Sequence, residues 1–305
     1  MKEHSEEPGS LVHRPVMLLE TLEWLDIRQD RWYVDANLGG GGHTRAILDR
    51  GGCVLAIDRD AKAVERFLEE TGSRYSGRIV TVRGNNAEIA HHVRETGVTV
   101  SGILFDLGWS TLQGGESERG LSFSEEGPLD MRLDTTSEET AEDLLERLPE
   151  NDLADLFAEG DEPLALPIAR ALVQARKSGR LPRTTTDLAA FVSGVYYRKG
   201  FRRSKRHPAT RVFMALRIRV NREYENLEKS LSGSREVLAE KGGRLLVLTF
   251  HSGEDRIVKR TFRQWVAEGE ANFLFRKSLP PGEAEVRENP RSRSARLRGV
   301  SFGGG

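Results

Sequence analysis

The sequence is poor in cysteine and has no long hydrophobic run. Its single cysteine, Cys53, excludes disulfide bonds within the chain, and the apolar segment around it favours a buried thiol. No apolar run reaches the length of a membrane span. Residues 1–10 are acidic and polar and lack the apolar core of a signal peptide. We therefore expect a cytoplasmic protein without a membrane segment.

Recognisable metal-binding motifs are also missing. The seven histidines show none of the short spacings typical of metal ligands, and there is no paired-cysteine motif. The sequence thus predicts no metal. With 305 residues and 37% hydrophobic content, the chain can bury a sizeable core, as one large domain or as one domain that carries an insertion.

Acidic residues are absent between Asp187 and Glu223, although the whole chain has a net charge of -1. This segment carries ten cations, which we call the basic belt: Arg198, Lys199, Arg202, Arg203, Lys205, Arg206, Arg211, Arg217, Arg219 and Arg222. Clustered cations without compensating acids attract phosphate backbones, so the belt favours a nucleic-acid partner. A merely solvated face is the alternative, although such faces usually mix both signs.

A turn of four glycines, residues 39–42, follows the first predicted strand and precedes a predicted helix. Glycines let the backbone approach a ligand closely, and the helix start offers unpaired N–H groups. The spacing does not fit a dinucleotide fingerprint, because Thr44 or Arg45 stands where glycine or alanine is required. No lysine follows, as a P-loop would require. A tight turn without a ligand is the alternative.

Polar side chains stand at or just beyond the ends of the first four predicted strands. They are Asp35, Asp58, Asn86 and Asp106. Strands that alternate with helices indicate an α/β fold with a parallel sheet, whose ligands bind beyond the carboxyl ends of the strands. We expect these four side chains to converge at that edge. Asp58 is placed to hydrogen-bond a ribose.

From about residue 114 to residue 207 the pattern changes to helices without strands. Apolar residues recur at helical spacing over residues 140–148, 152–157, 163–177 and 186–197. We interpret residues 114–207 as an inserted helical substrate-recognition domain. Residues 1–113 and 208–305 would then form the α/β domain.

The last third of the chain predicts further elements of the α/β domain. A helix is expected over residues 208–231, a fifth strand over residues 244–250 and a helix over residues 256–265. His251 follows this strand, where it either faces substrate or only hydrogen-bonds within a helix cap. The basic tail, residues 289–298, is expected to add a closing strand or a phosphate contact.

Motifs spread from residue 13 nearly to the end of the chain carry a family resemblance. The most specific are residues 35–43, 56–60, 102–108, 119–120, 127–132, 207–211, 250–252, 254–256 and 289–291. In this order they resemble the RsmH (MraW) family of small-subunit ribosomal RNA cytosine-N4 methyltransferases. The resemblance implies a Rossmann-like class I methyltransferase sheet with helices on both faces and an inserted all-helical subdomain that helps hold RNA.

The resemblance also implies a cofactor, a partner and site residues. S-adenosylmethionine would be contacted by Gly41, Gly42, His43, Asp58, Asp106 and Gln113, with Asn86 near the adenine. The partner would be small-subunit ribosomal RNA within the assembled subunit, with no membrane and no metal, and a homodimer stays open. The methyl group would pass to the exocyclic nitrogen of a cytidine in the decoding region.

Several positions depart from the family pattern. Asn86 replaces a usual aromatic residue, Trp109 a valine and Gly253 a leucine. Loss of one apolar wall at Asn86 would weaken cofactor binding by roughly 1–2 kcal/mol, and stacking by Trp109 could offset it. Trp109 is also the candidate to stack on a cytosine that has left its helix.

Asp106, or the carbonyl groups of residues 107–108, is our candidate acceptor for the amino group of the cytosine; alternatively Asp106 serves only the cofactor. Three other functions stay open at this point. A methyltransferase for DNA or a small molecule would share the cofactor half but would not need the basic belt. A ribosome-assembly protein without catalysis would keep the belt but not the cofactor. A nicotinamide oxidoreductase fits least, because the glycine spacing fails.

Overall fold

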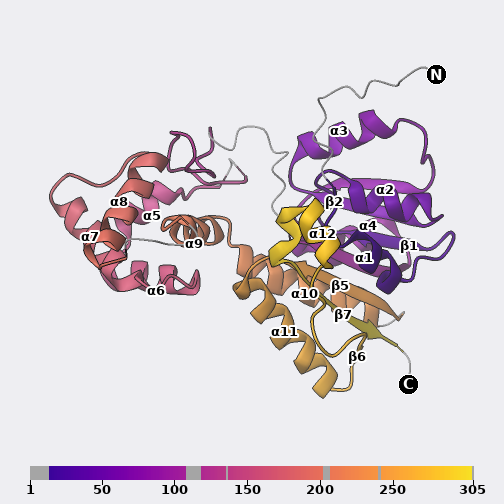
Figure 1. Ribbon diagram of the computed structural model, residues 1–305. Coiled ribbons are helices and arrows are strands. Elements are labelled where there is room, and N and C mark those ends of the chain that lie inside the picture. The colour runs from indigo at the N-terminus through magenta and orange to yellow at the C-terminus, as the bar shows by residue number, and fades with distance from the viewer. Residues whose placement is uncertain (1–13, 108–117, 135–136, 202–206, 240–241, 304–305) are drawn as a thin grey trace, which may run out of the picture. The chain divides into compact units, whose positions relative to one another are not determined.

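The computed structural model describes residues 14–107, 118–134, 137–201, 207–239 and 242–303 (Figure 1). Contacts between Cα atoms divide the chain into two compact units. Unit 1 comprises Met1–Leu112, Gly233–Phe250 and Phe262–Gly305, and unit 2 comprises Gln113–Ser232 and His251–Thr261. The domain boundaries expected near residues 113 and 208 stay a prediction.

Unit 1 contains a seven-stranded sheet in the order β3-β2-β1-β4-β5-β7-β6. Its strands are β1 (Trp32–Asp35), β2 (Cys53–Asp58), β3 (Ile79–Arg83), β4 (Val100–Asp106), β5 (Gly243–Thr249), β6 (Ala271–Phe273) and β7 (Arg296–Phe302). The first five are parallel, and β7 runs antiparallel to both β5 and β6. The strand order reverses between β1 and β4, which is where ligands bind in sheets of this kind.

Helices lie against both faces of this sheet, which confirms the predicted α/β fold (Figure 1). They include α1 (Leu18–Leu25), α2 (Gly42–Asp49), α3 (Ala61–Thr71), α4 (Ile89–Thr96) and the short α12 (Glu283–Glu288). Strand β2 is buried along almost its whole length, as expected for a strand covered on both sides. Two large apolar side chains of these helices, Leu19 and Leu68, are 72% and 42% exposed, because they lie beside the buried stripes of their helices.

Unit 2 is helical over its described residues. Its helices are α5 (Ala141–Arg147), α6 (Glu150–Glu159), α7 (Ala165–Lys177), α8 (Thr185–Arg198), α9 (Thr210–Val220) and the first turns of α10 (Glu223–Ala239) and α11 (Ser252–Ala267). Apolar side chains from α5 to α9 form one buried core, which includes Phe157, Leu172 and Leu216. The four helices predicted between residues 140 and 197 agree with α5 to α8 within a few residues.

The prediction of a single helix over residues 208–231 was wrong, because the helix is interrupted between α9 and α10. Arg222 adopts a left-handed conformation with φ of 49°. The amide of Asn221 donates to the carbonyl oxygens of Met131 and Arg217 and accepts from the backbone N–H of Leu133. These side-chain bonds compete with the helical hydrogen bonds, and they end α9 at this point.

Candidate functional site

The glycine turn joins β1 to α2 and is held in a conformation that needs glycine. Gly39 and Gly41 have φ of 50° and 71°, in the left-handed region. A Cβ atom on Gly41 would lie 2.2 Å from the ring of Phe67, and one on Gly42 would lie 2.9 Å from the ring of Pro15. Close packing therefore explains why glycine stands at these two positions, for which the sequence predicts cofactor contact.

Asp35, at the end of β1, is the most deeply buried acid of the sheet edge, with 1% of its surface exposed. Its carboxylate accepts hydrogen bonds from the hydroxyl of Thr44 at 2.6 Å and the backbone N–H of Asn37 at 3.2 Å. Burial raises the pKa of Asp35 to about 6, although the charge of His43 and both hydrogen bonds act to lower it. Asp35 is thus a structural anchor of the turn.

His43 connects the glycine turn to Asp106. The ring is 4% exposed; its Nε2 lies 3.2 Å from the carbonyl oxygen of Val16, and its Nδ1 lies 3.5 Å from a carboxylate oxygen of Asp106. A carbonyl oxygen can only accept, so Nε2 carries the proton. The Val16 contact therefore fixes the ring orientation and directs Nδ1 toward Asp106, at the end of β4.

Asp58, at the end of β2, shapes the turn from the neighbouring strand. One carboxylate oxygen accepts from the backbone N–H of Gly39 at 2.8 Å, and the other accepts from the N–H of Asp60 at 2.9 Å. Burial raises the pKa of Asp58. Asn86 begins a 3-10 helix after β3, and its amide lies 3.4 Å from the carbonyl oxygen of Ala36, just beyond β1.

The predicted site residues of unit 1 therefore meet at one edge of the sheet, except for those outside the described residues. Hydrogen bonds or ion pairs join β1 and its turn to β2, to β4 and to Asn86. Gln113 and Trp109 lie outside the described residues. The edge offers carboxylates, an imidazole and glycine backbone around the strand reversal, which suits a nucleoside with a charged substituent.

The comparisons with known proteins identify the family. A model of the MraW methylase family matches residues 10–302. The chain belongs to this family. It is 44% identical to Ribosomal RNA small subunit methyltransferase H of Thermomicrobium roseum, an alignment that covers 96% of this chain and 94% of the relative. It is 43% identical to the protein of the same name from Syntrophobacter fumaroxidans, over 96% of this chain and 98% of the relative.

Among solved structures, an rRNA methylase from Streptococcus thermophilus matches 96% of this methylase with a TM-score of 0.45 and 10% identity; the match covers 99% of that chain. No helix in the described part of this methylase is long and apolar enough to cross a membrane.

S-adenosylmethionine is the cofactor of this methylase. The residues at the sheet edge fit it, because backbone N–H groups of Gly39, Arg59 and Asp60 hold the Asp58 carboxylate, whose roughly four acceptor sites leave one for a ribose hydroxyl. The left-handed glycines bring backbone, without side chains, to the same edge.

His251 lies in unit 2, at the start of α11, where sequence reasoning left its role open. Its backbone N–H donates to the carboxylate of Glu254 at 3.4 Å, which is the bond that the third helical residue contributes to a capping box. Gly253 is explained by a neighbour in the same unit: a Cβ atom there would lie 1.8 Å from the hydroxyl of Tyr224. Tyr224 thus occupies the space that a larger residue at position 253 would need.

The basic belt divides into exposed and paired cations over its described residues. Arg198, Lys199, Arg219 and Arg222 are exposed. Arg217 instead forms a two-point ion pair with Glu223, at 2.8 and 2.9 Å. Its assignment to a phosphate-binding surface is therefore corrected: this guanidinium holds α9 to the start of α10.

Proposed function

We propose that this methylase transfers a methyl group from S-adenosylmethionine to the N4 atom of a cytidine in the decoding region of small-subunit ribosomal RNA, in the cytoplasm. The observation that carries the proposal is the near full-length identity of 44% to a relative named Ribosomal RNA small subunit methyltransferase H. The motif resemblance supports the cytosine-N4 position. The exposed cations of the basic belt support an RNA partner.

The cofactor supplies a methyl group on a positively charged sulfur. The cytosine amino group is a weak nucleophile, because its lone pair is delocalised into the ring, so positioning supplies much of the rate. We assign Asp106 as the acceptor that orients this amino group and stabilises the positive charge that develops on it. His43 would act as a positioning residue, because the Val16 carbonyl fixes its ring and directs Nδ1 toward Asp106.

The folded subunit is the expected substrate, because RNA in a folded particle would present the target cytidine and its flanking phosphates in one shape. The exposed cations of unit 2 would contact phosphates and fix the register of the RNA without reading its sequence. Specificity would then come from the base that leaves its stack and enters the pocket.

The test is transfer of a labelled methyl group to three substrates in parallel: assembled small subunits, naked ribosomal RNA and DNA. We expect label in assembled subunits and much less in the other two. Label in DNA at the same rate would contradict an RNA substrate. No transfer despite measured cofactor binding would direct the search to another acceptor, and no cofactor binding would favour a role in assembly without catalysis.

A further inference from the structure

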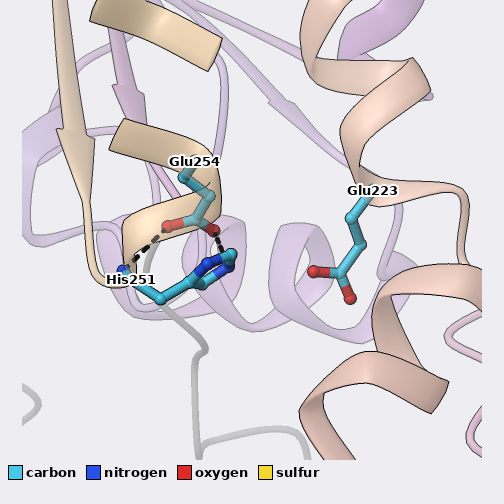
Figure 2. Close-up of side chains that lie close together, drawn as sticks. All are labelled: Glu223, His251 and Glu254. Atoms are coloured by element: carbon cyan, nitrogen blue, oxygen red, sulfur yellow. Dashed lines mark hydrogen bonds and ion pairs between the residues drawn. The ribbon is translucent and has the colours of Figure 1, made fainter. Parts of the chain in front are cut away.

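Three side chains of unit 2 form a compact polar group, which we call the His251 cluster. Glu223 comes from the first residue of α10, whereas His251 and Glu254 come from the start of α11 (Figure 2). One potential ligand atom from each residue lies within 4.8 Å of the other two. Figure 2 shows the Glu223 carboxylate pointing toward the imidazole, with one oxygen of Glu254 next to the ring.

Two side chains at this cluster have buried polar atoms without a hydrogen-bond partner among the described residues. These atoms are Nδ1 and Nε2 of the His251 ring and the hydroxyl oxygen of Tyr224. The two rings are neighbours, with centroids 5.9 Å apart. Nε2 of His251 lies 3.1 Å from an oxygen of Glu254, but this contact does not have the alignment of a hydrogen bond. Buried unsatisfied polar atoms that gather at one place point to a missing ligand.

Helix capping explains part of the cluster but not the imidazole. Glu223 and Glu254 lie in the first turns of α10 and α11, where the helix dipole favours negative charge. Arg217 also donates one hydrogen bond to each carboxylate oxygen of Glu223. Each of these oxygens therefore keeps one lone pair that can bind a further ligand. None of these contacts satisfies the ring nitrogens of His251.

The charge of the cluster favours a cation. Glu254 is 6% exposed and Glu223 is half-buried, so the cluster brings two largely buried carboxylates together, of which Glu223 pairs with Arg217. Two carboxylates at one place attract a cation and repel an anion. One imidazole nitrogen with two carboxylate oxygens is a donor set that zinc and manganese accept, and the arginine would orient a ligating carboxylate from outside.

We propose that Glu223, His251 and Glu254 bind one divalent transition-metal ion, with zinc the best fit to the imidazole and carboxylate donors. The ion would tie the first turn of α10 to the first turn of α11 within unit 2. The sequence did not indicate this site, because Glu223 and His251 are 28 positions apart (251 − 223) and do not form a short motif. The inference is independent of the proposed methyl transfer.

The experiment is calorimetric titration of the full-length chain, stripped with a chelator, with zinc chloride and in parallel with manganese and magnesium chloride. We expect one zinc ion per chain, weaker manganese binding and no measurable magnesium binding. Glu254→Gln and His251→Asn should each weaken zinc binding at least 10-fold, which corresponds to about 1.4 kcal/mol. His91→Asn is the matched control, because His91 forms an exposed pair with Glu95 on α4, 3.4 Å apart.

A second measurement keeps the test informative if the variants do not fold. X-ray absorption at the zinc edge of the wild-type complex should show a shell of nitrogen and oxygen with one imidazole. A sulfur ligand would place the ion at Cys53 and overturn the assignment, as would a shell of water alone. Absence of zinc binding, or equal binding by wild type and both cluster variants, would also overturn it. None of these readouts depends on methyl transfer.

Discussion

Asp35 in unit 1 ends the parallel strand β1, and His251 in unit 2 comes two residues after the parallel strand β5. The polar side chains around these two residues are buried in different ways. At the edge of unit 1, Asp35 accepts two hydrogen bonds and His43 contacts a carbonyl and a carboxylate. In unit 2, His251 and Tyr224 keep buried polar atoms that no described residue satisfies. Asp35 and His43 are therefore held in place by the chain itself, whereas the unsatisfied atoms of His251 and Tyr224 require a bound ligand.

The comparison separates two roles for buried charge. In unit 1 the chain provides partners for Asp35, Asp58 and His43, although Oδ1 of the neighbouring Asn37 is buried without one, so these side chains can hold a fixed geometry for chemistry. In unit 2 the unsatisfied atoms indicate a bound species. The following changes test this difference, beginning with the largest expected effect.

Asp106→Ala tests whether the preorganised edge performs chemistry. We expect a loss in kcat of roughly 100-fold or more, the usual cost of removing an aligned group that stabilises developing charge. Single-turnover transfer of labelled methyl to small subunits measures it, with the cofactor Kd determined on the same sample. Asp49→Ala, which removes a carboxylate bonded to Tyr75, is the control. Turnover near that of wild type would remove Asp106 from the mechanism.

Gly253→Ala tests the tight contact beside the His251 cluster. Alanine normally stabilises a helix relative to glycine, but here its Cβ atom would meet the Tyr224 hydroxyl, so we expect destabilisation by about 1–3 kcal/mol. Urea unfolding measures the change. The double variant with Tyr224→Leu should recover most of the loss. A more stable single variant would show that the contact relaxes easily.

Asp35→Asn tests the buried carboxylate of unit 1. The folded-state pKa of Asp35 is raised from 3.8 to about 6, so its contribution to stability is fully present below pH 3.8 and is lost as the pH rises through 6. The amide cannot ionise, so the stability of the variant relative to wild type should increase by about 1 kcal/mol between pH 5 and pH 7.5. Paired unfolding curves of the variant and the wild type, recorded at each pH, measure this difference. A constant difference would contradict the raised pKa.

Arg219→Ala and Arg217→Ala separate the two kinds of cation in the basic belt. Arg219 is exposed, so Arg219→Ala should change only RNA binding. We expect a few-fold loss of RNA affinity and a slope of log affinity against log salt concentration that is smaller by about 1. Arg217 pairs with Glu223, so its variant should lower the melting temperature. Filter binding at several salt concentrations and thermal unfolding measure both effects. Equal melting temperatures for the two variants would contradict the division.

Local patterns predicted much of the fold and of the unit 1 site. Strands with acids at their ends fix where those acids lie in a parallel sheet, so Asp58 and Asp106 could be placed from the sequence. The strand β6 and the helix α12 were not predicted, because three and six residues carry too little periodicity.

Features that depend on distant partners were not predictable. The break before α10 arises from bonds between Asn221 and residues about 90 positions earlier, which a helical apolar pattern does not reveal. The requirement for glycine at position 253 depends on Tyr224, on another helix. The ion pair of Arg217 crosses the same unpredicted break, so a count of cations assigned it to the RNA surface.

The position of the transferred methyl group tests the central claim most directly. Small subunits from cells that lack this enzyme would be incubated with the protein and labelled S-adenosylmethionine, then digested to nucleosides for mass spectrometry. We predict that the label elutes as N4-methylcytidine and is lost with the Asp106→Ala variant. Label on a ring carbon, on a ribose or on another base would contradict cytosine-N4 transfer.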